Sequence, residues 1–145
     1  MEKRGKWTVT LDAASHRGVL LKDKKGHFLP YCARYNDGYN KYQNFLSLRF
    51  DEMTSETLWL FCPKSHEARF LAYFLSYKAR PRMIFILLQH HELDNLFPVL
   101  KNNACQHYMI ENRNYLYRSV KNRTAHQLYP FQGVIHVFFL EKQSA

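Results

Sequence analysis

The chain of 145 residues lacks several features that define large classes of protein. No apolar run approaches the roughly 20 residues that a membrane-spanning helix requires. The first residues, MEKRGKW, are charged and lead into a polar strand, unlike a secretory signal. Cysteine is scarce, and Cys32, Cys62 and Cys105 are odd in number and widely spaced, which disfavours a disulfide framework or a zinc site. We therefore expect a cytoplasmic domain with reduced thiols and no membrane anchor.

Short catalytic motifs are also absent. The sequence contains no G-x-S-x-G, Walker loop or H-E-x-x-H. Its densest group of metal-binding side chains is His90-His91-Glu92. Adjacent residues at a strand end point in opposite directions, so the two histidines cannot easily share a metal ion without other ligands. Tyr117 and Lys121 could suggest a DNA-nicking tyrosine, yet no His-hydrophobic-His motif precedes them. None of these patterns points to a particular reaction, and none predicts a metal site.

Acidic residues are outnumbered, and the excess of positive charge lies at the two ends of the chain. There are 21 Lys and Arg against 12 Asp and Glu, a formal net charge of +9. Residues 1–50 hold ten basic and four acidic residues, residues 111–145 hold five and two, and residues 51–110 hold six of each. A basic surface attracts phosphates over roughly 8–10 Å. Either the flanks bind a polyanion such as RNA or DNA, or they only keep the chain soluble.

The residues that would contact nucleic acid belong to these flanks. They are Lys3, Arg4, Lys6, Lys22, Lys24, Lys25, Arg118, Lys121 and Arg123.

The N-terminal third predicts antiparallel β structure. Apolar residues alternate with threonine in Trp7–Leu11, the pattern of a half-buried strand. A polar stretch ending in Gly26 separates Val19–Leu21 from His27–Leu29 and predicts a hairpin. Alternation in Phe45–Phe50 predicts a further strand that faces the core through Leu46, Leu48 and Phe50.

Four tyrosines lie between these strands, next to basic residues. They are Tyr31, Tyr35, Tyr39 and Tyr42, interleaved with Arg34 and Lys41. Rings beside cations are what single-stranded nucleic-acid binders use, at roughly 1–3 kcal/mol per stacked base. The spacing is also helical and would suit packing on a sheet, although Asp37-Gly38 favours a loop. Packing or loop anchoring is the preferred interpretation, because aromatic side chains are mostly buried.

The second half predicts alternating strands and helices. The expected strands are LWLFC, RMIFILL, HYMIE, NYLYRSV and GVIHVFFL, with HYMIE and NYLYRSV as a pair. A first helix over residues 65–79 would be capped by Ser65 and ended by Pro81. It would pack through a stripe of Ala68, Leu71, Ala72 and Leu75 that Phe70, Phe74 and Tyr77 widen. A second, LFPVLKN, would start at Asn95 and stop at left-handed Asn102-Asn103. His136 is expected to be a hydrogen-bonded core histidine.

The predicted fold class is α+β with an α/β-like core: a mixed, largely antiparallel sheet with two helices. No repeat or linker divides the chain, so we expect one domain over residues 1–145. Within it, residues 1–57 form a β-rich basic part, residues 58–123 the α/β core, and residues 124–145 a closing strand.

Residues 58–123 resemble the C-terminal half of the GNAT (Gcn5-related N-acetyltransferase) fold. The resemblance rests on the order of strands and helices, on Arg80-Pro81 leading into RMIFILL, on LDNLFPVLKN and on NYLYRSVKNRT. In that family an Arg/Gln-x-x-Gly-x-Gly/Ala loop holds the pyrophosphate of acetyl-CoA at a helix start. The matching residues 63–69 contain no glycine. The resemblance therefore implies Lys64 and the amides of Ser65 and His66 as the cofactor-binding groups.

The resemblance also implies a reaction, direct attack of an amine on a thioester. A general base would deprotonate the amine, and a tyrosine would protonate the departing thiolate. Tyr108 is the nearest candidate for the acid, and Glu52 or Glu56 for the base. Each has a simpler interpretation, Tyr108 as a sheet residue and the glutamates as solvated turn residues.

Two functional hypotheses follow from the sequence. The first is an atypical or degenerate GNAT-like domain that binds an acyl-CoA-like ligand, acts as an N-acyltransferase, or keeps only the scaffold. The second is a non-enzymatic basic module that binds RNA or DNA. A protein-interaction subunit or a homodimer is a third hypothesis, because the apolar faces are broad.

Overall fold

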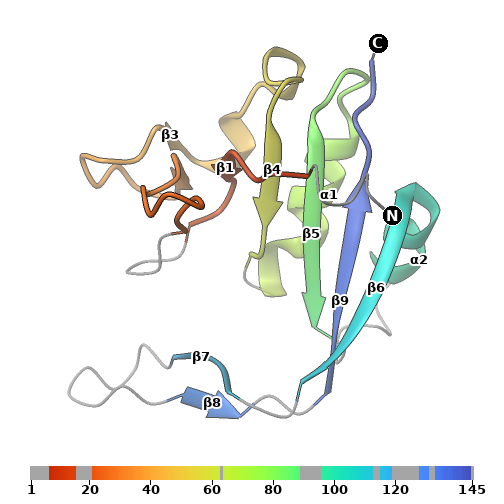
Figure 1. Cartoon of the computed structure of the whole chain (residues 1–145). Helices are drawn as coiled ribbons and strands as arrows, with labels where there is room; N and C mark the ends of the chain where they lie inside the picture. The colour runs from red at the N-terminus through yellow and green to blue at the C-terminus, as the bar shows by residue number, and fades with distance from the viewer. Residues whose placement is uncertain are drawn as a thin grey trace.

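The computed structural model describes residues 7–15, 21–62, 64–88, 96–112, 115–118, 128–130 and 133–144. Its centre is a five-stranded sheet with the order β1-β4-β5-β9-β6 (Figure 1). In that order the strands are Leu11–Asp12, Thr57–Leu60, Arg82–Leu88, Gly133–Leu140 and Ala104–Asn112. Two smaller pairs join β2 (Cys32–Ala33) to β3 (Tyr42–Gln43) and β7 (Tyr115–Arg118) to β8 (Leu128–Pro130).

The main sheet is mixed, as predicted for an α+β fold, but it has two parallel and two antiparallel pairings among the described strands rather than mostly antiparallel ones. β1, β4 and β5 run parallel, whereas β9 pairs antiparallel with β5 on one side and with β6 on the other. The expected pairing of HYMIE with NYLYRSV is wrong, because β6 pairs with β9 and β7 pairs with β8. The last strand in the sequence therefore lies inside the sheet, between two strands that precede it.

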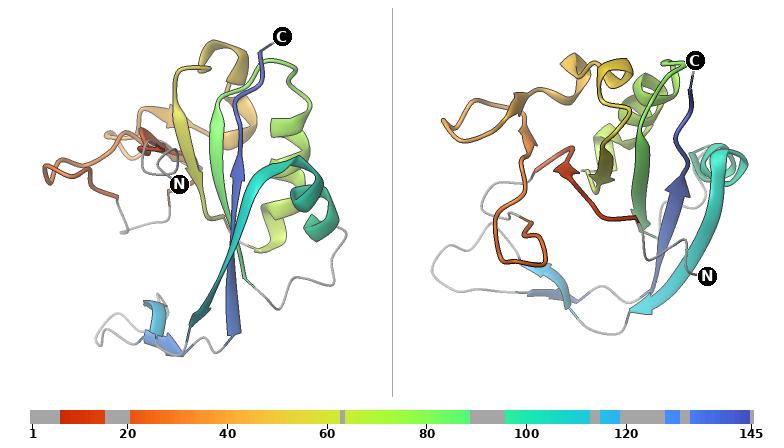
Figure 2. Two further views of the ribbon diagram at one scale, coloured as in Figure 1. Left: turned by 45° about the vertical axis from the view of Figure 1, so that its right-hand side comes forward. Right: turned by 45° about the horizontal axis from the view of Figure 1, so that its top comes forward.

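Both helices of the described chain cover the same face of the sheet (Figure 2). α1 (Glu67–Leu75) follows β4, and α2 (Leu96–Asn103) precedes β6. The core that they form with the sheet includes Leu58, Leu60, Leu71, Phe74, Phe85, Leu96, Leu100 and Phe138. Within the described residues, no helix is both long enough and apolar enough to cross a membrane.

β5 is buried on both of its faces, as its unbroken apolar run predicts. Every residue from Met83 to Leu87 is buried. On the face opposite the helices, the Trp7 ring lies edge-on to Phe139, with 5.0 Å between centroids, and Arg82 lies over the same indole at 4.9 Å. The segment before β1 therefore crosses the second face of the sheet.

The N-terminal third departs from the predicted antiparallel strands. Trp7–Leu11 forms a strand only at its end, where β1 pairs parallel with β4. The predicted turn is present: Leu29 N–H donates to the Leu21 carbonyl at 2.8 Å, and Gly26 has a φ of 87°. Positive φ costs glycine little, so Gly26 suits this tight turn.

The predicted strand Phe45–Phe50 is wrong, because this segment forms two short 3-10 helices, η2 (Phe45–Ser47) and η3 (Phe50–Glu52). Asn44 starts the first with a φ of 68°, and its side chain accepts the Leu46 N–H at 3.1 Å. The buried residues are Phe45, Leu48 and Phe50, so Leu46 does not take the predicted core position.

Aromatic packing on α1 explains why the 3-10 turns replace a strand. Phe45 stacks on Phe70 with 4.2 Å between centroids, and Phe50 lies edge-on to Phe74 at 4.9 Å. The same contacts correct the predicted inner stripe of α1. Ala68 and Ala72 are exposed, and the larger rings take the inner positions.

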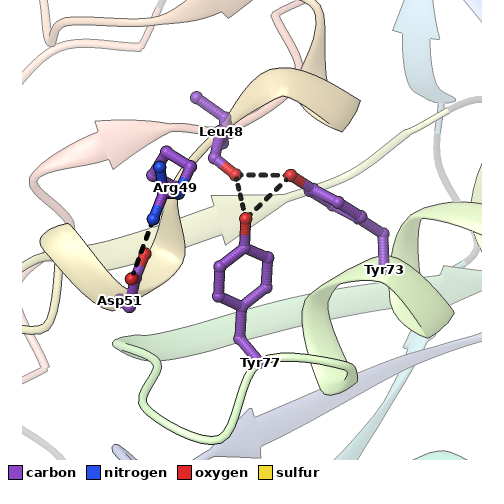
Figure 3. Close-up of polar contacts among 5 residues, drawn as sticks. All are labelled: Leu48, Arg49, Asp51, Tyr73 and Tyr77. Atoms are coloured by element: carbon purple, nitrogen blue, oxygen red, sulfur yellow. Dashed lines mark hydrogen bonds and ion pairs between the residues drawn. The ribbon is translucent and has the colours of Figure 1, made fainter.

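Two tyrosines of α1 and the turn after it hold the 3-10 segment in place (Figure 3). The Tyr73 hydroxyl donates to the Leu48 carbonyl at 2.7 Å, the Tyr77 hydroxyl donates to it at 3.2 Å, and the two hydroxyls lie 3.0 Å apart. Beside them, Arg49 pairs with Asp51 at 3.2 Å. One backbone carbonyl thus serves as the anchor between the 3-10 segment and the helix layer.

The ends of both helices differ from prediction. Ser65 does not cap α1: it lies in a 3-10 turn, η4 (Lys64–His66), and the helix starts at Glu67 without a side-chain cap. α1 also ends at Leu75, before Pro81. α2 spans the predicted residues, but its end is not left-handed, because Asn44 is the only described non-glycine residue with positive φ. Asn103 instead donates from its side chain to the Val99 carbonyl at 2.8 Å. The predicted cap Asn95 lies outside the described residues.

Candidate nucleic-acid interface

Two loops of the basic N-terminal part project beyond the β1 edge of the sheet (Figures 1 and 2). We call residues 22–28 and 34–41 together the aromatic loops. The first closes the turn at Gly26, and the second connects β2 to β3. Each loop is closed at its base by a backbone hydrogen bond, from Leu29 N–H to the Leu21 carbonyl at 2.8 Å in the first and from Lys41 N–H to the Tyr31 carbonyl at 3.0 Å in the second. The two bases are next to each other in the sequence, separated only by Pro30.

Three aromatic side chains of these loops are largely exposed. Phe28 is 61% exposed, Tyr35 is 69% exposed and Tyr39 is 88% exposed. Single exposed rings are common on protein surfaces, so these rings point to a ligand only if the groups beside them also suit one. Most of the surface of the three rings is open to solvent.

Cations lie against the rings of the aromatic loops. The Lys22 ammonium lies 5.0 Å from the centroid of Phe28, and the Arg34 guanidinium lies 5.2 Å from that of Tyr35. Lys24 and Lys25 are exposed in the same turn as Lys22. Exposed ring faces and positive groups thus lie close together, the combination that single-stranded nucleic acids require.

The two carboxylates in these loops are occupied by the loops themselves. Asp23 accepts from the backbone N–H groups of Lys25 and His27, each at 2.9 Å, and the His27 amide is the main cause of its lowered pKa. Asp37 accepts from the hydroxyl of Tyr31 and from the N–H of Tyr39 at 2.8 Å. Both carboxylates stay negatively charged, but the loops hold five Lys and Arg against these two Asp, so their net charge is positive.

The four tyrosines divide between the two predicted roles. Tyr31 is buried, and its hydrogen bond to Asp37 raises its pKa to about 12. Tyr42 is half-buried and packs against the core. These two match packing or loop anchoring, whereas Tyr35 and Tyr39 extend into solvent.

The other predicted nucleic-acid contacts cannot be placed around this surface. Lys3, Arg4, Lys6, Lys121 and Arg123 lie outside the described residues. Arg118 is the last residue of β7, in the small sheet apart from the main one. Of the predicted set, Lys22, Lys24 and Lys25 are the members whose exposed side chains are described.

The predicted cofactor-binding residues form the turn before α1. Lys64, Ser65 and His66 make up η4, and the His66 ring stacks on Phe70 with 5.5 Å between centroids. The Nδ1 atom of His66 is buried and has no hydrogen-bond partner among the described residues. Glu67, the first residue of α1, is buried. A pyrophosphate bound at this turn would therefore be held mainly by the backbone amides of η4.

The structure does not bring the predicted catalytic residues together. Glu52 lies in η3 and Glu56 just before β4, at the opposite end of that strand from η4. β4 pairs with β5 along its whole length, from Thr57 to Leu60. Tyr108 lies on β6, where its hydroxyl donates to the Gln106 side chain at 3.2 Å.

Glu56 lies in a shallow open depression of about 170 Å³. The Thr10 hydroxyl donates to Glu56 at 2.6 Å. The lining residues are Thr54, Ser55, Glu56, Thr57, Arg82 and Lys142. Arg82 is paired with Glu141 at 2.9 Å, so one of the two cations at this depression is already neutralised.

His136 is buried and hydrogen-bonded, as predicted. Its Nδ1 lies 2.9 Å from Nε2 of His107, and the Lys101 ammonium lies 3.4 Å from the other nitrogen of His107. Burial, then Lys101 and His136, lower the pKa of His107. Phe97 lies edge-on to both rings. The pair is part of the packing between α2 and the sheet.

Sequence reasoning did not identify Asp12 as an unusual residue. Its carboxylate is 6% exposed, and burial raises its pKa to about 6. Burial also raises the pKa of Cys32 and of Cys62 to about 12, and all three cysteines are free thiols. The stretch LDAA, with one acid inside an apolar run, was the available signal for Asp12.

Neither a metal site among the described residues nor a similar protein indicates a function for this chain. In the part of the chain that the structure describes, no three His, Cys, Asp or Glu side chains come together as a metal site. No protein-family model matches the chain, and neither a curated protein nor a solved structure matches it. A function therefore has to be inferred from the chain's own residues.

Proposed function

We propose that this protein binds RNA or DNA through the aromatic loops, with the GNAT-like core serving as a scaffold. One observation carries the proposal: exposed rings and cations share the two loops, and the cations outnumber the carboxylates by five to two. Nucleic-acid binding needs positive charge for phosphates and flat apolar surfaces for bases. The aromatic loops supply both.

Charge gives the proposal its most direct test. Residues 22–41 contain five Lys and Arg against two Asp. Each phosphate contact releases counterions, so the logarithm of the binding constant falls with the logarithm of salt by about 0.7 per contact for a single strand. We expect binding of a fluorescein-labelled oligonucleotide to weaken steeply between about 50 and 200 mM salt, on the order of a tenfold loss for two to three contacts.

A matched pair of variants separates local from overall charge. Exchange of Lys22, Lys24 and Lys25 for Gln should lower the affinity and reduce the salt slope. The control exchanges three exposed cations elsewhere for Gln, namely Arg69, Lys78 and Lys142. Fluorescence anisotropy with the full chain measures both. Equal losses in the two variants, or no binding by the wild type, would reject this interface.

A second candidate function is binding of an acyl-CoA-like ligand. It is favoured by the parallel pairing of β4 with β5, because α1 follows β4 and precedes β5 in the sequence, as in the GNAT-like order of elements. Lys64 and the amides of Ser65 and His66 would contact the ligand, and catalysis would need Tyr108 with Glu52 or Glu56. A ligand that binds only the native state raises its melting temperature. Acetyl-CoA at about 1 mM, a concentration that detects even weak binding, should therefore raise Tm, and an unchanged Tm would reject this candidate.

A further inference from the structure

We infer that the aromatic loops select single-stranded over double-stranded nucleic acid, with Tyr35 and Tyr39 stacking on unpaired bases and Asp37 positioning them. This inference rests on the proposed function. Positive charge alone would not favour the single strand, because a duplex carries phosphates at a higher charge density. The choice between them depends on the rings and on how they are held.

The exposed rings suit bases that are not already stacked. In a duplex each base is covered above and below by its neighbours, so a protein ring reaches it only after unstacking. A single strand presents base faces directly to aromatic side chains. Tyr35 and Tyr39 leave most of their surface in solvent and lie in a loop, without a helix that could enter a groove.

The loop that carries these rings is held by one carboxylate. Asp37 accepts the N–H groups of Tyr39 at 2.8 Å and of Asn40 at 2.9 Å through one oxygen, and the hydroxyl of buried Tyr31 through the other. Gly38 follows with a φ of 88°, and its N–H donates to the Asn36 side chain at 2.9 Å. The four donors link the loop to itself and to the core.

A loop that is already ordered loses less entropy when a ligand binds. Asp37 therefore favours binding although its negative charge opposes a polyanion. The two effects have opposite signs, so they can be told apart. Removing the carboxylate should strengthen binding if charge alone matters, and weaken it if positioning of the rings matters.

The first experiment measures binding of three probes to the full chain: oligo-dT, oligo-U and a DNA duplex. Each probe is about 12 nucleotides or base pairs long, which is within the range of lengths that single-strand binding sites cover. We expect both single strands to bind more tightly than the duplex, and the DNA and RNA arms decide which backbone is preferred. Tyr35→Ala and Tyr39→Ala should each weaken single-strand binding by roughly 5- to 150-fold. Their salt slopes should stay unchanged, since no phosphate contact is lost.

Conservative variants control for structure. Tyr35→Phe and Tyr39→Phe keep the ring and should retain the wild-type affinity. Asp37→Ala should weaken single-strand binding despite the added positive charge, whereas Asp37→Asn, which keeps an acceptor oxygen for the two N–H groups, should restore it. Tighter binding by Asp37→Ala would overturn the positioning role.

The outcomes separate this inference from the function on which it rests. If the lysine variants lose affinity while the Tyr→Ala variants do not, the aromatic loops bind phosphates only and the inference fails. Equal affinity for duplex and single strand would overturn it as well. If the wild type binds none of the three probes, the proposed function itself fails.

Discussion

Asp12 should make the domain less stable at neutral pH than at mildly acidic pH. Burial raises the pKa of this carboxyl from 3.8 to about 6, against a hydrogen bond from the Ala14 N–H at 3.2 Å. The raised pKa means that folding favours the protonated acid. The corresponding stability is fully present below pH 3.8 and is lost as pH rises through about 6.

The size of the effect follows from the shift. About two pKa units correspond to about 3 kcal/mol, at roughly 1.36 kcal/mol per unit. The side chain is only 6% exposed, so solvent screens little of this cost. We expect Asp12→Asn to raise the free energy of unfolding at pH 7, relative to wild type, by up to that amount. Near pH 4 the difference between the two proteins should fall by about the same amount.

Urea denaturation from pH 4 to 7 measures this difference. The carboxamide that Asp12→Asn introduces is itself a buried donor, and leaving it without a partner costs about 1–3 kcal/mol at every pH. The informative quantity is therefore the change of the difference with pH, which a constant cost does not affect. Asp23→Asn is the control: the pKa of Asp23 is lowered, chiefly by the His27 amide, so its effect should have the opposite sign. A difference between Asp12→Asn and wild type that does not vary with pH would refute the reasoning.

Three further substitutions test the 3-10 segment, each by urea denaturation. Tyr73→Phe removes the shorter hydrogen bond to the Leu48 carbonyl and should cost about 1 kcal/mol, whereas Tyr35→Phe, on an exposed ring, should cost nothing measurable. Phe50→Ala empties a fully buried ring position and should cost about 3–5 kcal/mol; a loss below about 1 kcal/mol would mean that the aromatic cluster is not packed as described. Asn44→Ala should cost more than Asn44→Gly, because glycine accepts the φ of 68° although both lose the side-chain cap.

The second half of the chain was predictable because its patterns are long and have one interpretation. An unbroken apolar run such as Met83 to Leu87 is typical of a strand covered on both faces, and β5 has that burial. Leu96 and Leu100 lie four residues apart and both face the core from α2. Strand pairing was harder to predict, because nothing local in β9 shows that it inserts between β5 and β6.

The segment Phe45–Phe50 shows why the N-terminal part was less predictable. Its alternation is the signature of a strand, but its rings gain more by packing on α1 than by entering a sheet. Tertiary contacts of this kind override local propensity. On α1 itself, Phe70 and Phe74 face the core while Ala68 and Ala72 are exposed, since a large ring buries more apolar surface than a methyl group.

The candidate interface was predictable in composition and not in geometry. The sequence places rings beside cations, but it does not say which rings stay outside. Tyr31 is held inward by its hydrogen bond to Asp37, and that bond decides the orientation of the loop. Tyr35 and Tyr39 remain exposed because they flank the turn that Asp37 closes.

Folding and charge are therefore linked in the aromatic loops. Asp23 and Asp37 reduce the net positive charge of the loops, but each also accepts backbone N–H groups and so holds its turn in place. Replacing both acids would raise the net charge and also release the turns that aim the rings. If the loops bind a single strand, such a double variant should gain in salt slope and lose in affinity at high salt, where screening leaves mainly the stacked rings.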